Sequence, residues 1–127
     1  MNRFAATTLL VTLSAVATPA AAAVVVDKLT VRPNPARTSK GHPPELEFEV
    51  TIKDRGMARI LGCDLALDFG DGSPAIQQRF MDGGPRKATV KHVYDKPGDY
   101  IVIARGRQLA GGRACDAERR VQRRIGL

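Results

Sequence analysis

The sequence has few of the residues that catalytic and metal sites use. It contains no Trp, two Cys and two His, and beyond residue 23 its only serines are Ser39 and Ser73. Nucleophilic catalysis needs a Ser or Cys beside a His and an orienting acid, and a zinc site needs clustered Cys and His. Neither His42 nor His92 belongs to such a pattern. The sequence therefore predicts no catalytic, cofactor-binding or metal-binding residues and indicates that the chain is not an enzyme.

Long hydrophobic runs are also absent after the first residues. Arg3 precedes an apolar run over residues 4–17, and alanines at 20–23 provide small side chains for cleavage. We expect residues 1–23 to be a cleaved signal peptide, with the new N-terminus within one residue of Val24. A membrane anchor is the alternative, but this run is too short to cross ~30 Å of hydrocarbon. The protein is expected to be periplasmic or extracellular and not an integral membrane protein.

Residues 24–127 have the length of one domain. Cys63 and Cys115 both lie in this part, and an even number of cysteines in an exported chain indicates a disulfide. The alternative is two unconnected buried thiols. Both cysteines are expected on strands that flank the strand of Tyr100, at about 10 Å from each other, so a bulge or bend would be needed for the bridge.

Alternating polarity is the main structural signal. Over residues 45–53, Leu46, Phe48, Val50 and Ile52 share one face, and Glu45, Glu47, Glu49, Thr51 and Lys53 share the other. This period of two predicts a strand with one face in a core and the other in water. Six further strands are expected at 24–31, 60–69, 75–80, 88–94, 100–108 and 113–125. Seven short strands and no helix predict an all-β, immunoglobulin-like antiparallel β-sandwich.

Two segments add a family resemblance. Residues 67–72 read LDFGDG, and residues 92–100 read HVYDKPGDY. The pair resembles the signature of the polycystic-kidney-disease (PKD) domain, with Leu67 where that family has a core Trp. The resemblance implies a single immunoglobulin-like module for protein or carbohydrate contacts. The residues that carry the motif are Asp68, Gly70, Asp71, Gly72, His92, Tyr94, Pro97, Gly98 and Tyr100.

The chemistry of the first segment is that of a turn. Gly70 and Gly72 permit the positive φ that a tight reversal needs, and Asp68 and Asp71 can accept hydrogen bonds from the turn's own amides. Calcium ligation by these carboxylates, together with Asp64, is the alternative. Their spacing differs from that of a calcium loop, in which every second residue supplies an oxygen.

The second segment also indicates structure more than chemistry. Pro97 and Gly98 suit the central positions of a type II turn, in which the Gly takes a positive φ. Tyr100 resembles the corner tyrosine of such sandwiches, whose hydroxyl bonds to nearby backbone. His92 is expected to make a structural hydrogen bond.

Positive charge is concentrated near the C-terminus. The net charge of the whole chain is +7, and between residues 105 and 124 seven arginines face only two acidic residues. Clustered arginine is typical of polyanion binding, here of acidic glycans, lipid headgroups or anionic proteins. Nucleic acid is disfavoured because few aromatic residues are free to stack on bases. The alternative is that these arginines serve solubility and protect a sheet edge.

The period of two predicts where some of these arginines lie. If Tyr100, Val102 and Ala104 point inward, their neighbours point outward. The resulting candidate binding residues are Ile101, Ile103, Arg105, Arg107, Arg120 and Arg124. An apolar centre with charged surroundings is typical of a partner site. Isolated exposed isoleucines with no function are the alternative.

These observations favour an exported, non-enzymatic binding module for protein or glycan contacts at the cell envelope. Two alternatives stay open. One is a structural accessory subunit of a larger envelope assembly, and the other is a basic polyanion-binding protein.

Overall fold

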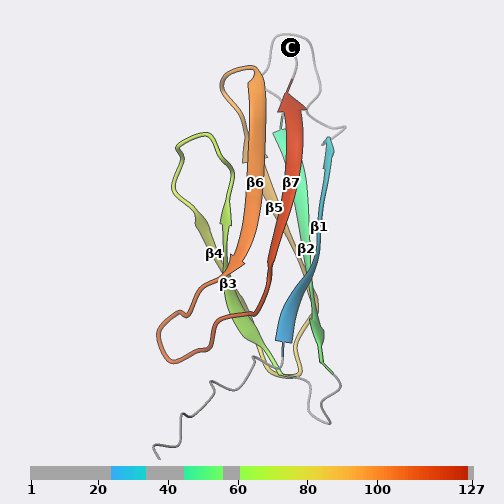
Figure 1. The fold of residues 1–127 in the computed structure, drawn as a ribbon, viewed down its shortest axis with the longest axis vertical. Helices are drawn as coiled ribbons and strands as arrows, with labels where there is room; N and C mark the ends of the chain where they lie inside the picture. Colours follow the sequence, from blue (N-terminus) through green and yellow to red (C-terminus); the bar gives the residue numbers. More distant parts are fainter. Residues whose placement is uncertain (1–23, 34–44, 56–60, 126–127) are drawn as a thin grey trace, which may run out of the picture.

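The computed structural model describes residues 24–33, 45–55 and 61–125. These residues form seven strands in two antiparallel sheets, and the described ranges contain no helix long and apolar enough to cross a membrane (Figure 1). One sheet has the order β1-β2-β5 and consists of β1 (Val24–Pro33), β2 (Glu45–Asp54) and β5 (Lys87–Val93). The other has the order β4-β3-β6-β7 and consists of β4 (Ile76–Phe80), β3 (Cys63–Asp68), β6 (Gly98–Gly106) and β7 (Glu118–Ile125).

This strand order confirms the predicted sandwich. The first, second and fifth strands of an immunoglobulin-like fold share one sheet, and the third, sixth and seventh share the other. The structure has this arrangement, and β4 lies beside β3 at the edge of the second sheet. The expected sheet of three strands therefore has four.

The alternating segment behaves as predicted, with one exception. Leu46, Phe48, Val50 and Ile52 are all buried. Glu45 was expected on the water-facing side but is only 8% exposed. It is the first residue of β2 and is paired with Val93 of β5. At the end of a strand, neighbouring segments can cover a side chain on either face, so the alternation alone does not predict its burial.

Aromatic residues fill the core in place of the missing Trp. Leu67, at the Trp position of the resembled motif, is fully buried. Phe48 lies 5.3 Å from Phe69 and 6.5 Å from Tyr94, measured between ring centroids. Tyr94 is the largest of the fully buried side chains. A cluster of three smaller rings thus provides the bulk that one large ring would supply.

The last strand begins later than predicted: β7 starts at Glu118 and not at residue 113. Residues 113–116 have a separate role. Cys115 N–H donates to Asp64 O (2.8 Å), and Asp116 N–H donates to Val24 O (2.9 Å). Because successive residues of an extended chain point to opposite sides, the segment bonds to β3 on one side and to β1 on the other. It therefore closes one flank of the sandwich between the two sheets. The ladder of β7 begins only after Ala117, whose φ is 65°.

Candidate binding surface

The predicted disulfide is present. Cys63 and Cys115 are bonded, with their Cα atoms 4.8 Å apart. The expected separation of about 10 Å assumed that both residues lie on strands flanking β6. The structure closes this distance because Cys115 has left the ladder of β7 and lies directly beside the start of β3. The bend that the bridge requires is at Ala117.

The buried carboxylate of Asp64 forms an ion pair with the exposed Arg79, which the sequence did not predict. Its carboxylate is 2% exposed and accepts from Arg79 Nε at 2.8 Å and Nη2 at 3.2 Å. The hydrogen bond from Arg79 lowers the pKa of Asp64, against the opposing effect of burial. Leu109 N–H donates to the same carboxylate (3.1 Å), and Arg79 Nη2 also donates to Ala110 O (2.7 Å). The pair therefore holds the loop between β6 and β7 against the outer side of β3 and β4.

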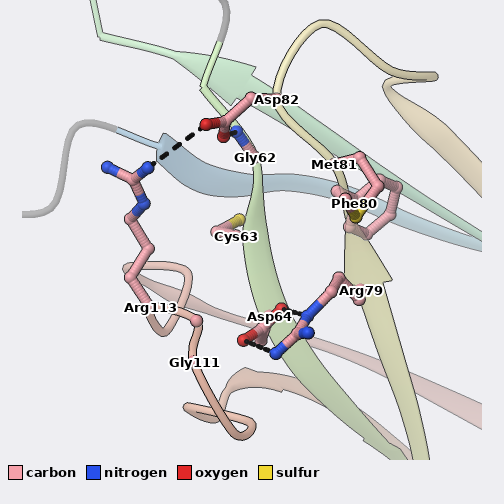
Figure 2. A pocket seen from close by; sticks show the side chains of 10 residues that line it. Gly62, Cys63, Asp64, Arg79, Phe80, Met81, Asp82, Gly111 and Arg113 are labelled. Carbon is pink, nitrogen blue, oxygen red and sulfur yellow. Dashed lines mark hydrogen bonds and ion pairs between the residues drawn. The ribbon is translucent and has the colours of Figure 1, made fainter.

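A hollow of about 500 Å³ adjoins this loop (Figure 2). Arg79 and Asp64 lie at one end of it, and Arg113 approaches Asp82 to 3.6 Å at the other. Gly112 belongs to its wall, where a Cβ atom would lie 1.9 Å from Asp64 Oδ2. The two guanidinium groups each face a carboxylate of the hollow, so its lining has no excess of either charge.

The turn of residues 70–73 has the structural role that its sequence predicts. Gly70 and Gly72 have φ values of 76° and 83°. Asp68 Oδ1 accepts from Gly70 N–H (2.9 Å), and Asp71 Oδ1 accepts from Ser73 N–H (3.1 Å). Both carboxylates are thus engaged by the turn's own amides. Within the described ranges, no three His, Cys, Asp or Glu residues are grouped to hold a metal ion.

His92 connects this turn to the core. Its Nε2 lies 2.7 Å from Asp71 Oδ2, and its ring stacks on Phe69 with centroids 3.8 Å apart. Burial raises the pKa of Asp71, but hydrogen bonds from Ser73 and His92 outweigh it and lower the pKa to about 2. The structural hydrogen bond expected of His92 is present.

The two tyrosines of the second segment make different contacts. Tyr100 OH donates to Lys96 O (2.5 Å), four residues upstream, which is the contact of a corner tyrosine. Tyr94 OH donates to Phe69 O (2.9 Å) inside the core, and burial raises the pKa of this phenol. The predicted type II turn is wrong, because Gly98 does not have a positive φ. Gly98 instead begins β6, paired with Ile125, where the backbone is extended.

Five of the six predicted binding residues share one face. Val102 and Ala104 are buried, so Ile101, Ile103 and Arg105 lie on the outer side of β6. Ile103 is paired with Arg120, and Asp99 with Arg124, and paired residues of neighbouring strands point to the same side. We call the surface of Ile101, Ile103, Arg105, Arg120 and Arg124 the β6–β7 face; Figure 1 shows its two strands side by side. Arg107 is exposed but lies in the loop beyond β6.

The β6–β7 face combines exposed apolar surface with charges that are only partly paired. Ile101 is 48% exposed. Arg124 lies 3.7 Å from Asp99, and Arg120 lies 2.5 Å from Glu118. Arg105 has no ion pair or hydrogen bond from its side chain to any residue that the structure describes. Its charge is therefore available to a partner.

The remaining arginines of the basic segment do not add to this face. Arg113 is beside Asp82 in the hollow, and Arg119 Nε donates to Val26 O (3.2 Å) at the junction with β1. Arg123 is paired with Tyr100, on the other side of the sheet from Arg120 and Arg124. The seven arginines are thus distributed over several surfaces instead of forming one continuous patch. This distribution supports only a local site for a polyanion.

The outer face of the other sheet has a different character. Its two central carboxylates are paired across neighbouring strands: Glu47 with Arg32 (2.6 Å) and Lys91 (3.9 Å), and Glu49 with Lys87 (3.8 Å). Exposed pairs of this kind contribute little to stability but leave little net charge for a partner. Lys28 of β1, opposite Thr51, is exposed on the same face and has no ion pair to a described residue. Of the two sheet faces, the β6–β7 face is the stronger candidate for binding.

Comparisons with known proteins do not identify a family. No protein-family model, no curated protein and no solved structure matches the chain. The residues and geometry of the β6–β7 face therefore carry the functional argument.

Proposed function

We propose that this chain is an exported, non-enzymatic binding module, similar to a PKD domain, that contacts an anionic protein or glycan at the cell envelope through the β6–β7 face. The observation that carries the proposal is the exposed side chain of Ile101 on the same strand as the unpaired Arg105. An apolar centre whose surroundings remain polar is the usual anatomy of a protein interface.

Export is supported by two features. The disulfide Cys63–Cys115 suits an oxidising compartment, since thiols are kept reduced in the cytosol. The apolar run at residues 4–17 supports secretion from the sequence, although it lies outside the described residues. The similarity to PKD domains is supported by Asp68, Asp71 and Tyr100, whose hydrogen bonds stabilise turns as the resembled motif implies.

The test is capture of partners from an envelope extract by immobilised protein, with bound species identified by mass spectrometry. Ile101→Glu and Arg105→Glu change the two halves of the face. Met81→Glu and Lys28→Glu are the matched controls, because both residues are exposed and lie outside the β6–β7 face. We expect each face variant to reduce capture at least about tenfold, which corresponds to about 1.4 kcal/mol, and both controls to retain it.

Other results would contradict the proposal. Loss of partner capture in Met81→Glu alone would place binding at the hollow beside the loop between β6 and β7. Loss in Arg105→Glu but not Ile101→Glu, with binding abolished by salt, would favour a polyanion-binding protein without an apolar contact. Capture that is unchanged in both face variants would exclude the β6–β7 face.

A further inference from the structure

The opposite edge of the four-stranded sheet carries a second surface. β4 is bonded only to β3, so its other side is an open strand edge in the described part of the chain. Ile76, Gln77 and Arg79 of β4 are exposed. An open edge presents unpaired N–H and C=O groups on which another strand can add.

The hydrogen bonds of Asp64 determine which groups of β4 face outward. Asp64 N–H donates to Arg113 O (2.7 Å), and Asp64 O accepts from Cys115 N–H (2.8 Å). The backbone N–H and C=O of Asp64 thus point away from β4, so Asp64 and Arg79 are opposed residues whose backbones do not hydrogen-bond to each other. Along an antiparallel ladder, pairs whose backbones hydrogen-bond to each other alternate with pairs whose backbones do not. The backbone N–H and C=O groups of Gln77 and Arg79 therefore point to the open side of β4.

One of these outward groups is already engaged. The side-chain amide of Gln78 donates to Arg79 O (3.0 Å). The N–H and C=O of Gln77 and the N–H of Arg79 are left for a further strand. They form a short, regular set of donors and acceptors at the centre of the edge.

The other edge strands are protected in ways that β4 is not. β5 carries Lys87 and Lys91, and exposed arginines lie along β7. β1 shifts register at Asp27, where Arg119 also caps its backbone at Val26. Lysines, other charges, bulges and shortness of the strand are the devices that keep sheet edges from pairing, and of these β4 has only its length of five residues. The only charge of β4 is Arg79, which is held by Asp64 of its own chain.

We infer that β4 pairs with β4 of a second copy of this chain, antiparallel, about a two-fold axis at Gln77. Each Gln77 then donates to and accepts from its counterpart, and each Arg79 N–H meets Ala75 O of the other copy. The outward groups match themselves under this symmetry, as an isologous contact requires. The only charge of this edge, Arg79, is paired with Asp64 of its own chain, so no unpaired like charges meet at the axis.

Self-association of this kind has a consequence for binding. The two-fold axis is perpendicular to the sheet, so the outer faces of both copies lie on the same side of one continuous sheet. Two β6–β7 faces would then be available to a repetitive partner, which raises avidity without any new contact. The pairing itself rests on β4 alone and does not depend on the proposed function.

Cysteine cross-linking tests the register. Opposed residues of a hydrogen-bonded pair have Cα atoms about 5.5 Å apart, within the range of a disulfide. Gln77→Cys is therefore expected to form a covalent dimer under mild oxidation. Gln122→Cys, exposed on β7, is the control and should stay monomeric under the same conditions. Equal cross-linking of the two variants would overturn the proposed axis.

Sedimentation equilibrium tests the association without a new thiol. Wild-type protein should shift from monomer to dimer with rising concentration, and Gln77→Pro should stay monomeric, because Pro removes an outward N–H and leaves the bonds to β3 intact. If Gln77→Pro does not fold, Gln77→Lys, which brings like charges together at the axis, replaces it. A wild-type protein that stays monomeric at about 1 mM, or a Gln77→Pro dimer, would show the inference to be wrong. Protection of the Gln77 amide by an unrelated extended peptide, with no self-association, would also reject a second copy.

Discussion

Removal of the disulfide is expected to have a large and measurable effect. Cys63 and Cys115 are 52 positions apart in the sequence. In the chain-entropy model, a cross-link closing a loop of this length destabilises the unfolded state by about 4 kcal/mol. A single domain has a total unfolding free energy of only about 5–15 kcal/mol. The double variant Cys63→Ala/Cys115→Ala should therefore lose a large share of its stability.

The assay is urea unfolding followed by far-ultraviolet circular dichroism, because the chain has no Trp to report by fluorescence. We expect a loss of about 4 kcal/mol, and a fall in Tm of roughly 15–30 °C for a domain of this size. Hydrogen exchange should locate the change. The amides of Leu109 and Cys115, which bond to Asp64 beside the bridge, should exchange faster at conditions where β2 remains protected.

Wild-type protein that has been reduced and alkylated while unfolded provides an independent comparison for the double variant. Agreement between the two would assign the effect to the cross-link instead of to the substituted side chains. A loss below about 1 kcal/mol in both samples would refute the reasoning, since the bridge would then constrain an unfolded chain that is already compact.

Three smaller predictions concern the loop between β6 and β7, the core, and the turn of residues 70–73. Gly112→Ala should displace Asp64, because the added Cβ would lie 1.9 Å from the carboxylate. In urea unfolding it should lower the free energy of unfolding more than Gly72→Ala, in which the alanine would have a strained positive φ but no close neighbours. Tyr94→Phe leaves a buried carbonyl without its donor and should cost about 1–3 kcal/mol, measured in the same way. The pKa of Asp71 is about 2 when folded and near 3.9 when unfolded, so its stabilising contribution is complete above pH ~4 and is lost as the pH falls toward 2; Asp71→Asn should flatten this acid limb of the stability curve.

The parts of the fold that follow the two-residue period could be predicted from sequence. β2 alternates between apolar and polar residues, and the structure buries its apolar side. β6 is apolar on both sides at its centre, but the period of two with Val102 and Ala104 inward correctly separated its inner and outer residues. Gly70 and Gly72 occupy positions where only a residue without a Cβ adopts the required φ easily, and this identified the turn.

The rest depended on contacts between distant segments. Ala117 ends the extended segment with a positive φ, although alanine has no preference for that conformation, so the bend could not be predicted from the residue type. Asp64 and Arg79 are on neighbouring strands, and their pairing requires the register of β3 with β4. Arg120 and Arg124 were placed correctly on the outer side, but their partners Glu118 and Asp99 depend on the register of β6 with β7.

Photo-cross-linking in the cell that produces the protein tests the binding account most directly. Gln122 lies opposite Ile101 at the centre of the β6–β7 face. Replacing it with a photoreactive amino acid removes no charge from that face. The same group at Thr30, exposed on the outer side of the other sheet, is the matched control. The account predicts a discrete adduct with a partner from Gln122 and none from Thr30. An adduct from Thr30 alone, or no adduct from either position, would contradict it.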